Sequence, residues 1–266
     1  MTKISPLAQV SKDAKIANDV EIGPFAIIEE GAEISSGVKI WPNAHICRGT
    51  TIGEGTEVHM GAVLGHFPQD LTFDRSRKTR LIIGKKCVIR EHATLHRSTK
   101  EESPTTVGDN CYIMATSHVG HDCHVGNNVI VANGALLAGH VMVGDGAFVS
   151  GNVVIHPFCR IGALAMIGGF SAVNKDVPPY MLVRGPSLVR AVNLIGLRRA
   201  KISRDIISDI KEAHKYLYCS DLNTAHAVEA IKKLKPSKEV SGLIEFIQSS
   251  KRGICKSKDS GDESFE

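Results

Sequence analysis

The sequence predicts an all-β solenoid of short parallel strands followed by a helical domain. Two observations lead to this fold class. An aliphatic residue recurs at every sixth position from Val10 to Val173, with two interruptions, and beyond residue 187 apolar residues follow helical spacing instead. With 266 residues, 42% of them hydrophobic and 23% charged, the chain is long enough to bury a sizeable core, which excludes disorder as its overall state.

The six-residue period runs through two blocks. The positions of the first block are Val10, Ile16, Ile22, Ile28, Ile34, Ile40, Ile46, Ile52, Val58 and Leu64. Those of the second are Ile83, Ile89, Leu95, Val107, Ile113, Val119, Val125, Val131, Leu137, Val143, Val149, Ile155, Ile161, Ile167 and Val173. A period of six fits one short strand plus a corner, and three such units close a triangular coil. Residues one coil apart, 18 positions on, then lie above one another at the inter-strand spacing of ~4.8 Å.

The position four residues after each aliphatic is restricted to small side chains. Cysteine occupies it at Cys87, Cys111, Cys123 and Cys159, so we expect these thiols to pack in the core without a chemical role. The seven cysteines form no CxxC pair, and the sequence therefore indicates neither a disulfide framework nor a structural zinc site.

Two irregular segments interrupt the repeat, at residues 66–80 and 96–106. Both contain proline and charged residues where an aliphatic residue is due, so we predict two loops that leave the coil. Long loops on a rigid scaffold often bind a ligand, although a tolerated surface insertion remains the alternative.

The repeat stops at Asp176–Tyr180. We therefore expect residues 1–186 to form the β-helix domain with its two loops and residues 187–255 to form the C-terminal helical domain. The polar tail, residues 256–266, is expected to be disordered.

Helical spacing predicts four apolar groups beyond Ser187. They are Leu188, Val192, Leu194 and Ile195; Ile206, Ile207, Ile210, His214 and Leu217; Ala227, Ala230, Ile231 and Leu234; and Val240, Leu243, Ile244 and Ile247. Ser203 and Asp221 are the expected N-caps, and Pro236 is expected to end the third helix.

Charge and hydropathy exclude several classes of protein. A formal charge of +4 gives no reason to expect nucleic-acid binding. The first residues contain no apolar signal segment, so we expect a cytoplasmic protein. The longest uncharged run, Val125–Gly144, contains asparagines and four glycines, and we expect no membrane insertion.

The stacking rule brings several histidines to one edge of the coil. It places Gly139 over His121 and His140 over Asp122, with His118 and His156 in neighbouring turns. A histidine beside an aspartate is a candidate general base with its orienting carboxylate. For five other histidines we prefer the interpretation that exposed coil or helix positions tolerate this residue. They are His45, His59, His124, His214 and His226.

Zinc ligation is the competing interpretation. His118, His121 and His124 have ligand-like spacing, as do His92 and His96. Residues three apart in a coil point in different directions, however. We therefore expect neither a metal nor a cofactor.

Longer motifs carry a family resemblance. Ser117–Cys123, Leu137–Val141 and Asp176–Tyr180 resemble the UDP-N-acetylglucosamine O-acyltransferases, which catalyse the first step of lipid A synthesis. The same family is matched by Pro68–Leu71, Leu95–Arg97 and Ser250–Gly253, so the likeness runs from about residue 4 to 255. It implies a left-handed parallel β-helix of hexapeptide repeats.

The resemblance also implies a reaction. His121 would be the general base that takes a proton from the sugar 3-position as it attacks the thioester of an acyl carrier protein. Asp122 would hold the imidazole, and the Gly139 amide would donate to the oxyanion of the tetrahedral intermediate.

Further residues gain implied roles in a cleft shared by adjacent subunits of a homotrimer. Contacts to sugar, nucleotide or pantetheine would come from Asp70, His96, His118, His140, His156, Asn193 and Arg199. Gly169 matches the position that limits acyl-chain length. The basic residues Arg198, Lys201 and Arg204 are candidates for docking the acidic carrier protein, with a solvated helix face as the alternative.

Four positions depart from the family pattern: Thr72, Pro157, Ile195 and Ala200. All four concern ligand contacts and not the base. Two alternatives therefore stay open, namely an acyltransferase for a related UDP-hexosamine with a 3-amino group and a non-catalytic homologue that binds the carrier protein.

Overall fold

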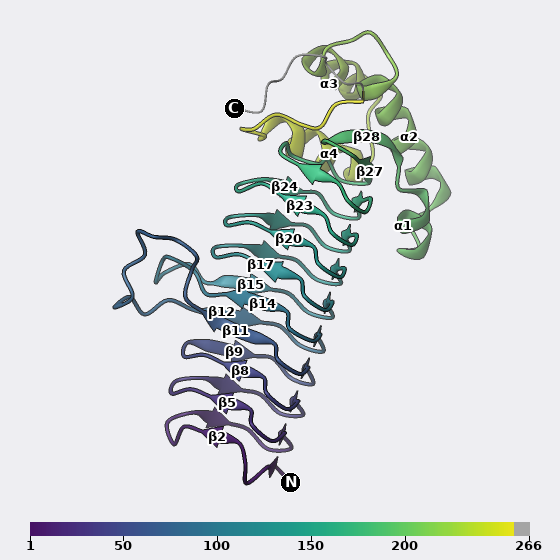
Figure 1. Cartoon of the computed structure of the whole chain (residues 1–266). Helices are drawn as coiled ribbons and strands as arrows, with labels where there is room; N and C mark the ends of the chain where they lie inside the picture. Colours follow the sequence, from purple (N-terminus) through teal and green to yellow (C-terminus); the bar gives the residue numbers. More distant parts are fainter. Residues whose placement is uncertain (258–266) are drawn as a thin grey trace.

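The structure, a computed structural model, describes residues 1–257. Figure 1 shows a straight column of stacked coils with the helices at its C-terminal end, and two loops that project from the same side of the column. Each coil contributes one short parallel strand to each of three sheets. This confirms the predicted parallel β-helix with C-terminal helices.

The strands are assigned to three sheets. Sheet A consists of β1 (Lys3–Ile4), β4 (Glu21–Ile22), β7 (Lys39–Ile40), β10 (Glu57–Val58), β13 (Val88–Ile89), β16 (Tyr112–Ile113), β19 (Ile130–Val131), β22 (Phe148–Val149), β25 (Met166–Ile167), β27 (Met181–Arg184) and β28 (Leu188–Val192). Sheet B consists of β2 (Gln9–Val10), β5 (Ile27–Ile28), β8 (His45–Ile46), β11 (Val63–His66), β14 (Thr94–His96), β17 (His118–Val119), β20 (Leu136–Leu137), β23 (Val154–Ile155) and β26 (Ala172–Val173). Sheet C consists of β3 (Lys15–Ile16), β6 (Glu33–Ile34), β9 (Thr50–Ile52), β12 (Leu81–Ile83), β15 (Thr105–Val107), β18 (His124–Val125), β21 (Met142–Val143) and β24 (Arg160–Ile161).

The register follows the 18-residue rule except at the two loops. Ile4 pairs with Ile22, 18 positions on, whereas Val58 pairs with Ile89 and Ile89 with Ile113. The first loop therefore adds 13 residues to one coil and the second adds six. The six-residue repeat resumes after each insertion, shifted by one position after the first loop and in phase after the second, and the strands on both sides still stack.

The interior of the column is aliphatic. The sixth-position residues from Ile22 onward are at most 3% exposed, and the four cysteines predicted to pack among them are at most 1% exposed. Burial raises the pKa of the Cys123 thiol to about 12 and that of Cys159 to about 11. These thiols stay protonated at neutral pH, as expected for packing residues.

The C-terminal helices are α1 (Leu194–Arg199), α2 (Arg204–Tyr218), α3 (Thr224–Lys233) and α4 (Lys238–Gln248). Ser203 caps α2 as predicted, because its side chain accepts a hydrogen bond from the Ile206 amide. The prediction of Asp221 as the next cap is wrong. Asn223, two residues after Asp221, caps α3 instead, because its side chain accepts a hydrogen bond from the His226 amide. Helix α3 ends before Pro236, as expected.

Helical structure begins later than the spacing predicts. Leu188–Val192 is not helical but forms β28, which pairs antiparallel with β27. The open edge of sheet A offers unpaired backbone groups, and satisfying them outweighs the local helical pattern. The division of the chain into domains at residue 186 stays a prediction.

The start of the tail also differs from expectation. Lys256 is bridged to Leu188, and the Val189 amide donates to the Lys256 carbonyl at 2.8 Å. The expected disorder is therefore wrong at this residue, and residues 258–266 lie outside the described part of the chain. Within the described part, none of the helices has the length and apolar character needed to cross a membrane.

Candidate active site

His121 and Asp122 form a hydrogen-bonded pair at the corner that follows β17. The His121 Nδ1 lies 2.7 Å from Asp122 Oδ2, and the side chains are 17% and 7% exposed. The corner places Asp122 in the left-handed backbone region, with φ 57°, which aspartate adopts more readily than most residues.

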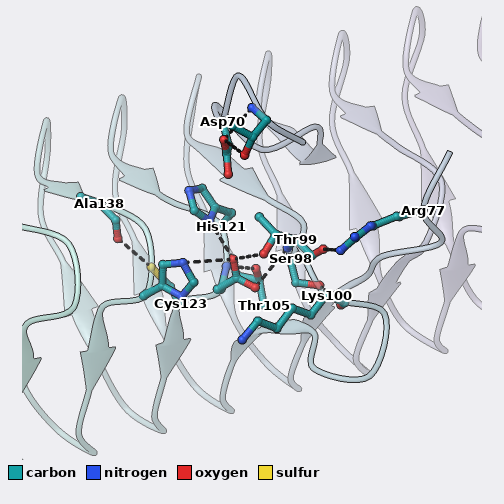
Figure 2. A network of polar contacts seen from close by, with 12 residues as sticks. Asp70, Arg77, Ser98, Thr99, Lys100, Thr105, His121, Cys123 and Ala138 are labelled. Atoms are coloured by element: carbon teal, nitrogen blue, oxygen red, sulfur yellow. Dashed lines mark hydrogen bonds and ion pairs between the residues drawn. The ribbon is translucent and has the colours of Figure 1, made fainter. Parts of the chain in front are cut away.

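The second loop holds the carboxylate. The Thr99 amide donates to Asp122 Oδ1 at 3.1 Å, and the Thr99 hydroxyl donates to Oδ2 at 2.8 Å (Figure 2). The Asp122 amide in turn donates to Thr105 Oγ1 at 2.8 Å. Asp122 is therefore fixed at both its carboxylate and its backbone.

These contacts define the protonation of the pair. Burial alone raises the pKa of Asp122, but the hydrogen bonds from His121 and Thr99 outweigh it and leave the pKa below its usual value. An ionised carboxylate only accepts hydrogen bonds, so the proton of the neutral imidazole lies on Nδ1. The Nε2 of His121 has no hydrogen-bond partner among residues 1–257, and its lone pair is available as a base.

Gly139 stacks directly against His121, as the 18-residue rule predicts. A Cβ atom on Gly139 would lie 2.6 Å from both Cε1 and Nε2 of the imidazole. The backbone amide at this corner position is not needed for the coil, because Pro157 occupies it one coil further on and Pro24 and Pro42 occupy it elsewhere. The Gly139 N–H has no acceptor within the described chain and is free to bind a ligand.

His140 lies beside the pair. Its Nε2 is 3.6 Å from Asp122 Oδ2, and its ring stacks on Phe158 with a centroid distance of 4.4 Å. Burial lowers the pKa of His140, although the Asp122 charge acts in the opposite direction. The imidazole is thereby kept neutral next to the base.

A groove of about 730 Å³ runs along the outer face of sheet B past His121. Its lining includes His96, His118, Gly139 and Pro157. The His96 and His118 rings meet edge to face at 4.9 Å, and the buried Nδ1 of His96 has no protein partner within residues 1–257. Burial lowers the pKa of His96 to about 4 and also lowers that of His118, so both present neutral rings to the groove.

Asp70 extends from the first loop over this site, facing His121 in Figure 2. Its Oδ1 accepts hydrogen bonds from the Thr72 amide at 2.8 Å and the Thr72 hydroxyl at 2.7 Å. These two bonds, with a smaller contribution from the charge of His121, lower the pKa of Asp70. Thr72 thus fixes the carboxylate and adds no charge.

Apart from the three docking residues, four predicted site residues neither line the groove nor interact with His121 within the described chain. His156 is exposed and contacts the Pro157 carbonyl at 3.0 Å. Asn193 caps α1 and donates to the Leu164 carbonyl at 2.8 Å, which commits both ends of its amide. Arg199 is exposed at the end of α1. Gly169 lies at the corner after β25, between sheets A and B, whereas His121 lies at a corner between sheets B and C. One chain alone does not bring these residues to His121.

The three basic residues predicted for carrier-protein docking share one surface. Arg198 lies in the last turn of α1, Lys201 lies in the turn that follows the helix, and Arg204 begins α2. All three are exposed, and none forms an ion pair within the described residues. Ile195 is likewise exposed on α1.

Sequence reasoning missed Thr99 and Thr105. The stacking rule applies only within the coil, and Thr99 lies in the second loop, where no periodicity places it. Thr105 lies 17 positions before Asp122, and that near-coil separation is a usable signal.

The histidine sets considered for zinc do not converge. Within the described residues the ligand atoms that cluster in this region are those of His121, Asp122 and His140, which lie within 4.8 Å of one another. The 2.7 Å contact between His121 and Asp122 is a hydrogen bond that already uses one ligand atom of each. Hydrogen-bonded acid–base chemistry explains the arrangement without an ion.

Comparison with known proteins shows the family of this chain. Residues 31–66 and 104–139 match the bacterial transferase hexapeptide family (six repeats), and residues 176–255 match UDP-N-acetylglucosamine O-acyltransferase, domain 2. The acyl-(acyl-carrier-protein)–UDP-N-acetylglucosamine O-acyltransferase of Halorhodospira halophila is 41% identical over 259 residues, covering 96% of this chain and 100% of the relative. The chain belongs to this acyltransferase family. The relative from Syntrophobacter fumaroxidans is 42% identical over 258 residues, with the same coverage.

Solved structures of this acyltransferase family have the same fold. The UDP-N-acetylglucosamine acyltransferase of Francisella novicida matches with a TM-score of 0.93 and 36% identity, covering 96% of this chain and 95% of that one. The enzyme of Bacteroides fragilis matches with a TM-score of 0.91 and 40% identity, covering 94% and 99%. The resemblance read from the sequence motifs is confirmed.

Proposed function

We propose that this chain transfers an acyl group, with or without a 3-hydroxyl, from acyl carrier protein to the 3-position of UDP-N-acetylglucosamine, the first step of lipid A synthesis. Family membership supports the substrates. The observation that carries the proposal is the placement of a free imidazole nitrogen of His121 against the free amide of Gly139.

His121 is the general base of this reaction. Its Nε2 accepts the proton of the sugar 3-hydroxyl as that oxygen forms a bond to the thioester carbonyl carbon. Asp122 holds the ring through Nδ1 and stabilises the imidazolium that results. When the tetrahedral intermediate collapses, the C–S bond breaks and the proton passes from Nε2 to the departing thiolate.

The Gly139 amide is the oxyanion donor. Charge develops on the carbonyl oxygen during attack, and a fixed N–H beside the base stabilises that charge without reorganisation. The position is suited to this role because the coil itself makes no use of the amide.

Substrate binding requires a second copy. Within one chain His96 and His118 line the groove beside the base, the His140 ring lies 5.2 Å from that of His121, and Asp70 faces His121 from the first loop (Figure 2). His156, Asn193 and Arg199 do not line that groove, and the groove wall exposes Leu136 and Val154 at 44% and 45%. A homotrimer would cover these apolar residues and supply the missing contacts from the neighbour.

The basic surface of Arg198, Lys201 and Arg204 is the proposed docking site for acyl carrier protein. Its unpaired charges suit an acidic partner. Charge reversal at Arg198 and Lys201 should raise KM for the carrier and weaken its salt dependence, with little change for the sugar nucleotide. Unchanged salt dependence would locate docking elsewhere.

Two alternatives differ in their chemistry. A sugar with a 3-amino group would need the same base. Thr72 stands where the resemblance leads one to expect lysine, and it gives Asp70 an uncharged hydrogen-bond donor. An assay with several UDP-hexosamines therefore has to identify the acceptor. A non-catalytic homologue would have no reason to keep His121, Asp122 and Gly139 in contact.

The decisive assay incubates the full chain with acyl carrier proteins of several chain lengths and a panel of UDP-hexosamines and detects products by mass. An O-acylated UDP-N-acetylglucosamine is expected, and the absence of acylation with every pair would contradict the proposal.

Sedimentation over a range of concentrations should give a trimer; a concentration-independent monomer would contradict the shared site. The proposal places the reaction in the cytoplasm.

A further inference from the structure

A second cavity, of about 580 Å³ and open to solvent, lies at the base of the first loop. It lies next to the groove. Leu95 pairs with Val119 of the following coil, and Arg97 and His121 each lie two positions after these residues, so they occupy the same corner in neighbouring coils. Its lining consists of Asp13, Glu30, Gly31, Arg48, Gly49, Arg75, Ser76, Arg77, Lys78, Thr79, Arg80 and Arg97.

The cavity is strongly cationic. Six of its lining residues are arginine or lysine and two are acidic. Arg48 is paired with Glu30 at 3.0 Å, whereas the other five cations form no ion pair within residues 1–257. Like charges gathered in one cavity repel one another unless an anion neutralises them.

Two buried polar groups in this cavity lack partners. Arg97 is 3% exposed and its Nε has no hydrogen-bond acceptor, while Thr79 is 1% exposed and its hydroxyl also has none within the described chain. Leaving such groups unsatisfied is costly, and each one requires an explanation. The Arg97 guanidinium packs over Phe67 at 4.5 Å, which fixes its orientation.

We propose that this cavity binds a phosphate-type oxyanion. Arginine presents planar N–H donors that match phosphate oxygens. Arg97 Nε and the Thr79 hydroxyl are covered by neighbouring atoms, so a phosphate satisfies them together once the side chains of the first loop that cover them shift aside. The exposed cations Arg75 and Arg80 complete a site that takes a phosphate group and not a neutral ligand.

Binding at this site would order the first loop over the base. The same loop carries Asp70, which faces His121, and Arg77, whose Nη1 donates to the Thr99 carbonyl at 3.3 Å (Figure 2). Thr99 in turn holds Asp122. An anion bound between the loop and the coil therefore stabilises the loop conformation that surrounds the acid–base pair.

The test is calorimetric titration of the full chain with inorganic phosphate, at constant ionic strength in chloride buffer. We expect one saturable site per chain. Thr79→Val keeps the side-chain shape and removes an unsatisfied hydroxyl, so it should fold and should weaken phosphate binding about three- to tenfold. Arg75→Gln should weaken it about tenfold. Arg190→Gln, an exposed arginine on β28, is the matched control and should bind as the wild type does.

Trypsin supplies a second readout, since Arg75, Arg77 and Lys78 are exposed cleavage sites. Phosphate should slow cleavage of this loop in the wild type and slow it less in Thr79→Val.

Saturating UDP-N-acetylglucosamine identifies the source of the anion: competition with phosphate assigns the site to the substrate diphosphate, and independent binding assigns it to free phosphate. No saturable binding, or equal binding by Thr79→Val and Arg75→Gln, would overturn the proposal while leaving the acyltransfer assay unaffected.

Discussion

Gly139 and His121 touch across neighbouring coils, with no room between them for a methyl group. A Cβ on Gly139 would fall 2.6 Å from Cε1 and Nε2 of the imidazole. The backbone of Gly139 is not in the left-handed region, so conformation alone does not demand glycine there. Glycine is required because the His121 ring packs against this backbone.

Gly139→Ala should therefore displace the base without unfolding the protein. The imidazole is the end of a side chain that can rotate away, so we expect a melting temperature near that of the wild type and a loss of about 10²-fold or more in kcat. Thermal unfolding and steady-state kinetics check this together. Gly242→Ala, where a Cβ meets nothing within 4 Å, is the control, and wild-type kcat in Gly139→Ala would contradict the contact.

Thr99 is a positioning residue whose effect reaches the base through Asp122. Thr99→Val removes the 2.8 Å hydroxyl bond and retains the amide bond, so it should raise the pKa of Asp122 and lower kcat about three- to tenfold with little change in KM. Thr99→Ser should restore activity. If kcat and its pH profile stay unchanged in Thr99→Val, the Thr99 hydroxyl does not position the carboxylate.

The contact of Gly139 could be predicted from the sequence, whereas that of Thr99 could not. Periodicity fixes register inside the coil, so the contacts of His121, Asp122 and Gly139 could be derived by counting. Thr99 lies in an insertion with no period. The strand at Leu188–Val192 was missed for a related reason, because the open sheet edge that pairs with it is a tertiary feature. Asn193, Arg199 and Gly169 do not line the groove of their own chain, and we propose that a second copy brings them to the site.

His96 should make stability depend on pH. Burial holds its pKa at about 4, below the ordinary 6.5. Between these values the unfolded chain binds a proton at this residue that the folded chain does not, so the free energy of unfolding falls as the pH drops from 6.5 towards 4. The loss is up to about 3 kcal/mol.

Denaturant unfolding of the wild type and of His96→Gln over that pH range measures this contribution. The slope against pH should be smaller in His96→Gln, whereas the exposed-site control His226→Gln should keep the wild-type slope. Equal slopes in all three proteins would show that His96 is not held neutral by burial.

Gly169 is the proposed limit on acyl-chain length. A Cβ there meets only the Gly151 carbonyl, at 3.3 Å, and its φ is not in the left-handed region, so a tight corner does not explain the glycine. Gly169→Met should fold and shift donor preference towards shorter chains. Each methylene denied burial costs about 0.8 kcal/mol, and three or four would change relative kcat/KM by about 10- to 200-fold. An unchanged chain-length profile would refute this assignment.

The most direct test of the mechanism is the single-turnover rate of acyl transfer to UDP-N-acetylglucosamine in His121→Ala. Because we propose Nε2 of His121 as the base, the rate should fall about 10²- to 10⁴-fold while sugar-nucleotide binding and thermal stability stay at wild-type values. His226→Ala, an exposed histidine on α3, should retain the wild-type rate. A His121→Ala protein that folds, binds the sugar nucleotide and transfers the acyl group at the wild-type rate would contradict the mechanism.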